Sequence, residues 1–336
     1  MPRSSPAVRS AWLGVASALL VLTGCARQPP PHRAYVTNER DGTITVIDTE
    51  SDRVVSSIEV GGRPRGIRLS PDGRRLYVAR STPMGQPYDP AVNHLVAVDV
   101  ARGRVVAEYV AGTDPEQLAV STDGRRLYTS NEDAGTATVF DLASGQPTAT
   151  LVVGIEPEGV TASPDGRWVY VTAETSNTVT VIDARADTVA ATFLVGARPR
   201  DTAFSPDSRW AYVSAEIGRT LSVVDTRTHT VVATVPLVAE GNVKPVGVVV
   251  SPDGRRVYVA LGRANAVAVI DAERRVMTGT IPVGNRVWGL GLTPDGRKLY
   301  AANGLSNDVS VIDTRAGRVT TTIPAGDGPW GVAIAP

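Results

Sequence analysis

The length, composition and charge of this chain exclude several kinds of protein. Its 336 residues hold 34 lysines and arginines against 34 aspartates and glutamates, so it lacks the positive excess with which proteins hold nucleic acid. The single cysteine excludes an internal disulfide and, because no Cys-x-x-Cys-His motif is present, a covalently attached c-type haem.

Residues 1–24 have the pattern of a bacterial lipoprotein signal peptide. Arg3 and Arg9 precede an apolar run at residues 11–22, which is too short to cross a bilayer but suits an export signal. The run ends in Leu22-Thr23-Gly24-Cys25, which resembles the lipobox, where a small residue precedes a cysteine that is lipidated and becomes the mature N-terminus. The alternative is an ordinary signal peptide with a chance cysteine.

The lipobox predicts an extracytoplasmic protein that is anchored to a membrane through Cys25. Residues 25–33 include three consecutive prolines and would form a short, stiff tether. Ala26, rather than an aspartate, follows the cysteine and resembles the sorting pattern for the outer membrane. In a Gram-negative host we therefore expect the protein on the outer membrane, facing the periplasm.

Residues 34–336 contain seven copies of one unit. A tyrosine and an aspartate recur about every 42 residues, at Tyr35, Tyr77, Tyr128, Tyr170, Tyr212, Tyr258 and Tyr300 and at Asp48, Asp99, Asp141, Asp183, Asp225, Asp271 and Asp313. Turns such as Ser70-Pro71-Asp72-Gly73 separate apolar runs, since Pro, Asp and Gly each favour a turn. Each unit should hold four short strands, which in the second unit fall near residues 66–70, 76–79, 95–99 and 105–111.

Repeated four-stranded units of this kind predict an all-β fold, a seven-bladed β-propeller with four antiparallel strands per blade. Prolines at 236, 282 and 324 fall in the fourth strand, which should be outermost because proline is tolerated only at sheet edges. The chain enters the first unit at its second strand and ends on a lone first strand at residues 331–335. We therefore expect the C-terminal strand to close blade 1 and remove an open edge.

Two stretches carry a resemblance to a known family. Tyr35-Val36-Thr37-Asn38, followed by Val46-Ile47-Asp48-Thr49, resembles the YVTN family of β-propeller repeats, and the resemblance covers all seven units. Residues 154–159 and 306–313 are similar to the propeller proteins found with PQQ-dependent alcohol catabolism. The resemblance implies an extracytoplasmic accessory protein near a quinoprotein dehydrogenase or its transporter, and it supplies no catalytic residue.

Two insertions are expected on one face of the propeller. One lengthens the loop between the second and third strands of unit 2, around residues 82–93, and the other lengthens the loop before Pro245. Both loops should border the same mouth of the central channel, and insertions in repeat folds collect on binding faces. The tether enters from the opposite face, so we expect this mouth to face away from the membrane.

The residues that begin each first strand should ring this mouth. Acidic side chains in blades 3 and 4, basic ones in blades 2 and 5 and tryptophans in blades 7 and 1 suit a planar aromatic anion, such as the quinone cofactor PQQ. The predicted ligand-binding residues are Arg63, Arg65, Glu116, Glu158, Arg198, Arg200, Lys244, Arg286, Trp288 and Trp330. The alternative is that these arginines and carboxylates only pair with one another and join the blades.

A second series of carboxylates recurs in the loops between second and third strands, at Glu39, Glu132, Glu174 and Glu216. Converging carboxylates would hold Ca²⁺ or act as acid and base, but shared ancestry of the repeats explains the series without function. His94 with Asp89 in the inserted loop is a further candidate for binding a metal, although a lone histidine in a loop is usually only solvated. The sequence therefore assigns neither a metal ligand nor a catalytic residue.

A more distant likeness is to the haem d1 propeller of nitrite reductases, which needs an axial histidine. His32 lies in the tether and His229 in a turn, so only His94 is placed to serve. The cofactor stays open between PQQ, haem and none.

The sequence favours a monomeric, non-catalytic binding or scaffold module that takes a protein or a small planar anion at the mouth. Two alternatives stay open. One is a metal-assisted hydrolase resembling a lactonase, and the other is a haem- or quinone-binding accessory to electron transfer.

Overall fold

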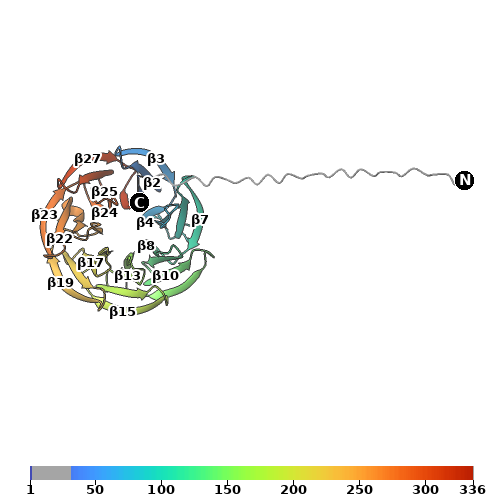
Figure 1. Cartoon of the computed structure of the whole chain (residues 1–336), viewed down its shortest axis with the longest axis horizontal. Coiled ribbons are helices and arrows are strands. Elements are labelled where there is room, and N and C mark those ends of the chain that lie inside the picture. The colour runs from blue at the N-terminus through green and yellow to red at the C-terminus, as the bar shows by residue number, and fades with distance from the viewer. Residues whose placement is uncertain (2–31, 336) are drawn as a thin grey trace.

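The computed structural model describes residue 1 and residues 32–335. These residues form seven four-stranded sheets arranged radially around a central channel, which confirms the predicted seven-bladed propeller (Figure 1). The predicted signal peptide, Cys25 and residues 26–31 of the tether lie outside the described residues. Within the described part, no helix has the length and apolar character needed to cross a bilayer.

Blades 2 to 7 take their strands in chain order, whereas blade 1 combines β28 with β1, β2 and β3. The strands of blade 2 begin at Arg63, Arg75, His94 and Arg104, close to the predicted residues 66, 76, 95 and 105. Blade 1 holds β28 (Pro329–Ile334), β1 (Arg33–Asn38), β2 (Thr43–Asp48) and β3 (Arg53–Glu59); blade 2 holds β4 (Arg63–Leu69), β5 (Arg75–Ser81), β6 (His94–Asp99) and β7 (Arg104–Val110); blade 3 holds β8 (Pro115–Val120), β9 (Arg126–Asn131), β10 (Thr136–Asp141) and β11 (Pro147–Val152); and blade 4 holds β12 (Pro157–Ala162), β13 (Trp168–Ala173), β14 (Thr178–Asp183) and β15 (Thr188–Leu194). Blade 5 holds β16 (Pro199–Phe204), β17 (Trp210–Ala215), β18 (Thr220–Asp225) and β19 (Thr230–Pro236); blade 6 holds β20 (Val248–Val250), β21 (Arg256–Ala260), β22 (Ala266–Asp271) and β23 (Val276–Pro282), with the 3-10 turn η1 (Gly262–Ala264); and blade 7 holds β24 (Val287–Leu292), β25 (Lys298–Asn303), β26 (Asp308–Asp313) and β27 (Arg318–Pro324).

The ring is closed by pairing between the two ends of the chain. β28 lies antiparallel to β1, with Ala34 opposite Ile334, and completes the sheet of blade 1 in the order β28-β1-β2-β3. This confirms the predicted closure. We label the four positions of a blade A to D from the axis outward, and Pro236, Pro282 and Pro324 end the D strands, as expected for sheet edges.

The turn between strands A and B shows why its residues recur. In blade 2 the Ser70 hydroxyl donates to Oδ1 of Asp72 at 2.6 Å, and the same oxygen accepts the backbone N–H of Arg74 at 3.0 Å. Gly73 completes the turn with a φ of 68°, a left-handed conformation that glycine adopts at little cost. The turn thus satisfies its own polar groups, so each A–B hairpin is specified locally.

Contacts between neighbouring blades form the core. The fully buried ring of Tyr170 packs with Val179 and Val181 of its own blade and with Phe204 and Val213 of blade 5. Burial of such large rings stabilises the fold by roughly 25 cal/mol for each Å² of apolar surface removed from water. The repeated tyrosines are therefore core residues, as the repeat pattern suggested.

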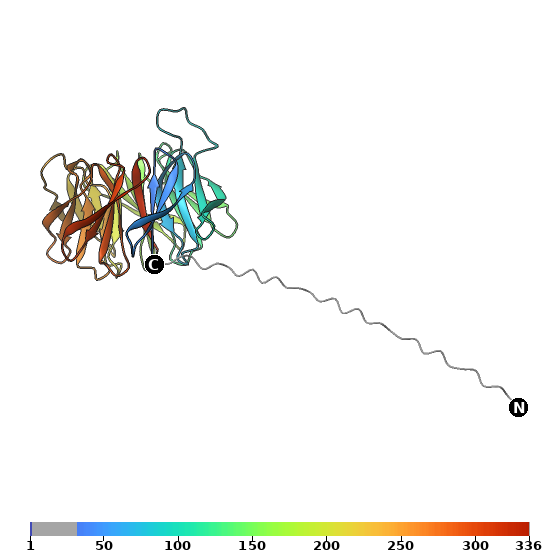
Figure 2. The same cartoon turned by 90° about the horizontal axis from the view of Figure 1, so that it is seen from above.

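The propeller has two unlike faces. We call the face with the A–B and C–D turns the A–B face, and the face with the B–C and D–A loops the B–C face. Loop 82–93 lies between β5 and β6, and loop 237–247 lies between β19 and β20, so both insertions border the B–C face. Figure 2 shows one long loop standing out on the side opposite the C-terminus, which ends β28 at the A–B face. β1 also begins at the A–B face, where the carbonyl of His32 accepts the backbone N–H of Thr49 in a C–D turn.

Candidate central-channel site

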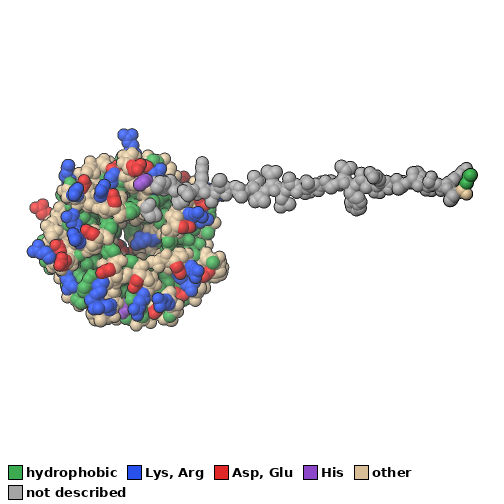
Figure 3. Space-filling view, in the orientation of Figure 1, with side chains coloured by type: hydrophobic (Ala, Val, Ile, Leu, Met, Phe, Trp, Pro, Cys, Tyr) green, Lys and Arg blue, Asp and Glu red, His purple; other side chains and the backbone are tan. Residues whose placement is uncertain are grey.

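The A strands surround a cavity of about 520 Å³ in the channel. Arg68, Glu158, Arg200 and Asp201 bring charge to its wall, and Trp288 and Trp330 bring aromatic rings. The wall continues to the last residues of the A strands, immediately before the A–B turns, at Leu69, Ala162, Phe204, Val250, Leu292 and Ile334. The cavity therefore extends toward the A–B face. Figure 3 views this face, which is hollowed at its centre with a basic side chain visible inside.

On the B–C side, ion pairs link blades 1, 2 and 3. Arg63 Nη2 lies 2.7 Å from Oδ1 of Asp114 and 3.1 Å from Oε1 of Glu116. Arg65 pairs with the other oxygen of Glu116, and its Nε lies 3.2 Å from Oε2 of Glu39. The Glu116 side chain is fully buried. These contacts join three blades through two arginines.

A matching group of ion pairs links blades 4 and 5. Arg200 Nη2 lies 2.9 Å from Oε1 of Glu158, and its Nη1 pairs with Glu174. Arg198 Nη2 lies 2.7 Å from Oε2 of Glu174, and its Nε lies 3.2 Å from Glu216. The arginines of blades 2 and 5 thus do pair with the carboxylates of blades 3 and 4, which was the alternative to a ligand site. Both groups lie toward the B–C face, because their residues are in the D–A and B–C loops or at the starts of the A strands.

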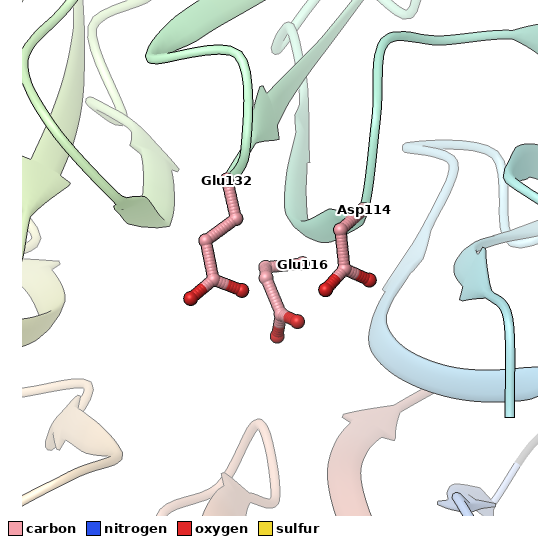
Figure 4. Close-up of side chains that lie close together, drawn as sticks. All are labelled: Asp114, Glu116 and Glu132. Carbon is pink, nitrogen blue, oxygen red and sulfur yellow. The ribbon is translucent and has the colours of Figure 1, made fainter. Parts of the chain in front are cut away.

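Three carboxyl groups of this network lie unusually close together. Oxygen atoms of Asp114, Glu116 and Glu132 fall within 4.8 Å of one another, and Figure 4 shows the three side chains converging from one side of the channel. A second set joins Glu132 to Glu158 and Glu174. Burial, together with the charges of Glu116 and Glu158, raises the pKa of Glu132 to about 9, so this group is a neutral acid at pH 7. Because arginines already hold Glu116, Glu158 and Glu174, a cation would have to compete with guanidinium groups for these oxygens.

The two channel tryptophans are stacked on each other and covered by arginines. The rings of Trp288 and Trp330 have centroids 6.0 Å apart and an interplanar angle of 28°. The guanidinium carbon of Arg286 lies 3.9 Å from the Trp288 ring centroid, and that of Arg65 lies 5.6 Å from the Trp330 centroid. A cation–π stack thus runs from Arg286 and Trp288 of blade 7 through Trp330 of blade 1 to Arg65 of blade 2. The indole N–H of Trp330 is buried and has no hydrogen-bond acceptor in the described part of the chain.

Four of the ten predicted ligand-binding residues line the cavity itself, namely Glu158, Arg200, Trp288 and Trp330. Arg63, Arg65, Glu116, Arg198 and Arg286 belong to the network above it. Lys244 lies in loop 237–247, and its side chain makes no ion pair within residues 32–335. Glu39 and Glu216 pair with arginines but join neither group of close carboxyls.

The histidines lie away from the channel wall. His94 begins β6 instead of lying in the inserted loop, and its Nδ1 is 2.9 Å from Glu108 on the outermost strand β7. Asp89 accepts the backbone N–H of Ala91 within the loop, and the side chain of His94 pairs with Glu108 instead. His229 Nδ1 is 2.7 Å from the hydroxyl of Tyr170. No histidine among residues 32–335 lines the cavity.

Two charged cavity residues had no counterpart in the sequence prediction. Arg68 lies three residues after Arg65 in β4, and Asp201 directly follows Arg200 in β16. At the position of Arg68 the other A strands carry small or apolar residues, such as Ala203 and Gly291. At the position of Asp201 most carry glycine. Arg68 and Asp201 thus depart from the repeat pattern, and this departure was the signal in the sequence that could have identified them as site residues.

Comparison with known proteins adds two family matches. The model described as Cytochrome D1 heme domain matches residues 157–329, and the model described as Choice-of-anchor I domain matches residues 31–204; each covers just over half of the chain. A curated relative, Antigen Lp49 of Leptospira interrogans, is 31% identical over 106 residues, which is 30% of this chain and 23% of that protein. The chain thus spans about a quarter of the length of the curated relative it matches.

Solved structures share the propeller fold at low sequence identity. Hydrazine synthase of Kuenenia stuttgartiensis is 21% identical with a TM-score of 0.75, over 89% of this chain and 99% of that one. A functionally unknown protein from Desulfotomaculum acetoxidans DSM 771 is 17% identical with a TM-score of 0.77, over 90% and 99% of the two chains. The dihydro-heme d1 dehydrogenase NirN, solved in complex with DHE, is 21% identical with a TM-score of 0.66, over 91% and 66%. At these identities the likeness concerns the fold alone.

Proposed function

We propose a function for this chain from one premise: it belongs to the cytochrome D1 heme domain family over residues 157–329 and to the choice-of-anchor I domain family over residues 31–204. On this premise, the chain is a non-catalytic module that binds a small molecule in its central channel. The observation that carries the proposal is the cavity of about 520 Å³, a size typical of small-molecule sites. Its wall combines apolar side chains with Arg68, Arg200 and the unpaired indole N–H of Trp330.

A binding role suits the charged groups better than catalysis does. Most carboxyl groups near the channel are paired with arginines, so they position the strands and determine the charge of the channel. Glu132 is the exception, because it is a neutral acid at pH 7, but no histidine contacts it among the described residues, and the neighbouring carboxylates of Glu116 and Glu158 are themselves paired with arginines. A hydrolase of the lactonase kind would need a free base and a bound metal at this point.

Two variants test whether the channel holds a ligand. Val249 and Ala162 line the cavity, so Val249→Phe and Ala162→Leu should reduce its volume. We expect the protein purified from its native host to carry a small molecule, detected by native mass spectrometry and by extraction after denaturation. Both variants should lose this molecule while keeping the far-ultraviolet circular dichroism of the propeller. Equal ligand content in wild type and both variants would place the molecule outside the channel and contradict the proposal.

We also propose the location and context of this binding. The lipobox at residues 22–25 supports a lipid anchor at Cys25 and an extracytoplasmic position. The stretches at residues 154–159 and 306–313, which are similar to PQQ-associated propellers, support an accessory role in PQQ-dependent alcohol oxidation or the associated transport. A neighbouring gene for a quinoprotein dehydrogenase, and loss of growth on alcohols after deletion of this gene, are the expected results. Unimpaired growth on alcohols that need the dehydrogenase would contradict that context.

A haem-type ligand is a second candidate, favoured by the cytochrome D1 heme domain match. Arg200 and the tryptophans suit the acidic groups and flat body of a macrocycle, but the described wall offers no histidine to its metal. A histidine-ligated haem therefore does not fit these residues. Adding haemin to the purified protein should give no absorption spectrum of bis-histidine or histidine-methionine ligation. Such a spectrum, lost in His94→Ala, would show that the channel rearranges around the haem.

A further inference from the structure

We infer that the channel ligand is a small anion with an apolar body, held by the guanidinium group of Arg68 and admitted from the A–B face. This inference rests on the proposed channel function and specifies the chemistry of the ligand and its direction of entry. It concerns a residue outside the predicted set and the end of the channel opposite to the predicted mouth.

Arg68 differs from the other channel arginines in its lack of a carboxylate contact. Its Nη1 donates to the carbonyl of Ile67 at 2.9 Å, and within residues 32–335 no carboxylate oxygen lies within 4.0 Å of the group. Arg63, Arg65 and Arg200, by contrast, each contact at least two carboxylates. A guanidinium offers five N–H donors, and Arg68, which lines the cavity, uses only one hydrogen bond among the described residues, to the carbonyl of Ile67.

The nearest acidic group is already engaged by the backbone. Asp201 attracts Arg68 electrostatically, but its Oδ1 accepts the N–H of Thr202 at 2.8 Å and its Oδ2 accepts the N–H of Val248 at 3.0 Å. Burial lowers the pKa of Arg68 and raises that of Asp201, as expected for two partly buried charged groups that line the cavity. An anion from solution that reached Arg68 would therefore form a strong, charge-assisted bond.

The side chains around Arg68 indicate the chemical nature of the part of the ligand that does not contact the guanidinium group. Leu69 follows it in β4, and Phe204, Leu292 and Ile334 line the same part of the cavity near the A–B turns. An inorganic ion would leave these apolar side chains uncovered, whereas a carboxylate with a hydrocarbon or aromatic body would cover them. The site therefore fits an amphipathic monoanion.

The difference between the two ends of the channel indicates the end from which the ligand enters. At the B–C end, Arg63, Arg65, Arg198 and Arg200 are already paired with glutamates, so that end offers an anion no unpaired guanidinium of this network. The A–B end is hollowed (Figure 3). β1 begins on this same face, so an anchor at Cys25 would attach the chain on the side from which the ligand enters. This differs from our sequence expectation of a binding mouth that faces away from the membrane.

The test compares two probes of equal shape, 2-naphthoate and its neutral amide 2-naphthamide, by isothermal titration with the purified exported protein. We expect wild type to bind the acid about tenfold or more tightly than the amide, because a hydrogen bond to a charged group is worth that factor. Arg68→Met, which keeps the length but not the charge, should weaken acid binding by about tenfold and change amide binding by less than about twofold. Arg68→Lys should keep part of the preference for the acid.

Arg74 provides a matched control, since it is an exposed arginine beside the A–B turn of the same blade. Arg74→Met should leave both affinities unchanged, and all variants should unfold at the wild-type urea concentration. Equal affinity for acid and amide, unchanged acid binding by Arg68→Met, or binding of neither probe by wild type would each overturn the inference. The proposed channel function has its own test: retention of the native ligand by Val249→Phe and Ala162→Leu would contradict that function, independently of the result for Arg68.

Discussion

The hydroxyl of Tyr300 donates a hydrogen bond of 2.6 Å to Oδ1 of Asp52, and this contact joins strand B of blade 7 to the C–D turn of blade 1. The Nζ of Lys298 reaches the other oxygen of Asp52 at 2.8 Å. Equivalent contacts link blade 3 to blade 4, through Tyr128 and Asp187, and blade 4 to blade 5, where His229 replaces the aspartate. The junction that closes the ring therefore uses the same device as two internal junctions.

Removing the Tyr300 hydroxyl should weaken the closure. Tyr300→Phe leaves a carboxylate acceptor without its donor, and we expect a loss of about 1–2 kcal/mol in the free energy of unfolding. Tyr212→Phe is the matched control, because the Tyr212 hydroxyl makes no hydrogen bond within residues 32–335 and the ring is equally buried. Urea unfolding, monitored by tryptophan fluorescence, gives the free energy of unfolding of both variants. Equal losses in the two variants would show that the Tyr300–Asp52 bond adds nothing to closure.

Arg200 is expected to be among the most costly arginines to remove. Arg200→Met leaves the buried Glu158 without its arginine and leaves Glu174 with Arg198 alone, so we expect a loss of about 3–5 kcal/mol. Arg297→Met, in which an exposed arginine loses a loose contact with Asp295, should change stability by less than about 1 kcal/mol. Thermal unfolding of the two variants gives the comparison. A loss below that of Arg297→Met would mean that the buried glutamates take up protons without cost.

The fold was predictable because each blade repeats a locally specified hairpin. The Ser70–Gly73 turn and the buried tyrosines establish the unit, and the A strand β28 pairs with β1 to complete blade 1. The site was harder to predict, because its residues meet only after the ring closes. Arg65 and Glu116 lie in neighbouring blades, and nothing in their sequence separation shows that they form an ion pair. Arg68 was missed because the prediction stopped at the first residue of each A strand, whereas the cavity follows the whole strand.

The anchor prediction concerns a residue outside the described part of the chain. Cys25→Ser should remove the site of lipidation, and because no other cysteine exists, labelling with radioactive palmitate should be lost completely. The wild-type protein should sediment with membranes and the variant should move to the soluble fraction. A variant that stays with membranes in high salt would indicate a different attachment, through either the uncleaved signal peptide or a protein partner.

The carboxyl group of Glu132 gives the channel a distinct response to pH. Burial first, then the charges of Glu116 and Glu158, raises its pKa from 4.5 to about 9 in the folded protein. The folded state therefore holds a proton that the unfolded state has released between these two values, so stability contributed by this group is present below pH 4.5 and declines as the pH rises toward 9. Glu132→Gln keeps the shape of the neutral acid and removes the titration. We expect wild type to lose more stability than Glu132→Gln between pH 6 and pH 9 in urea unfolding, by up to about 4 kcal/mol, since one proton held only by the folded state costs up to about 1.4 kcal/mol for each pH unit. Parallel stability curves for the two proteins would show that Glu132 is ionised in the native channel, and the carboxyl cluster would then carry a full negative charge there.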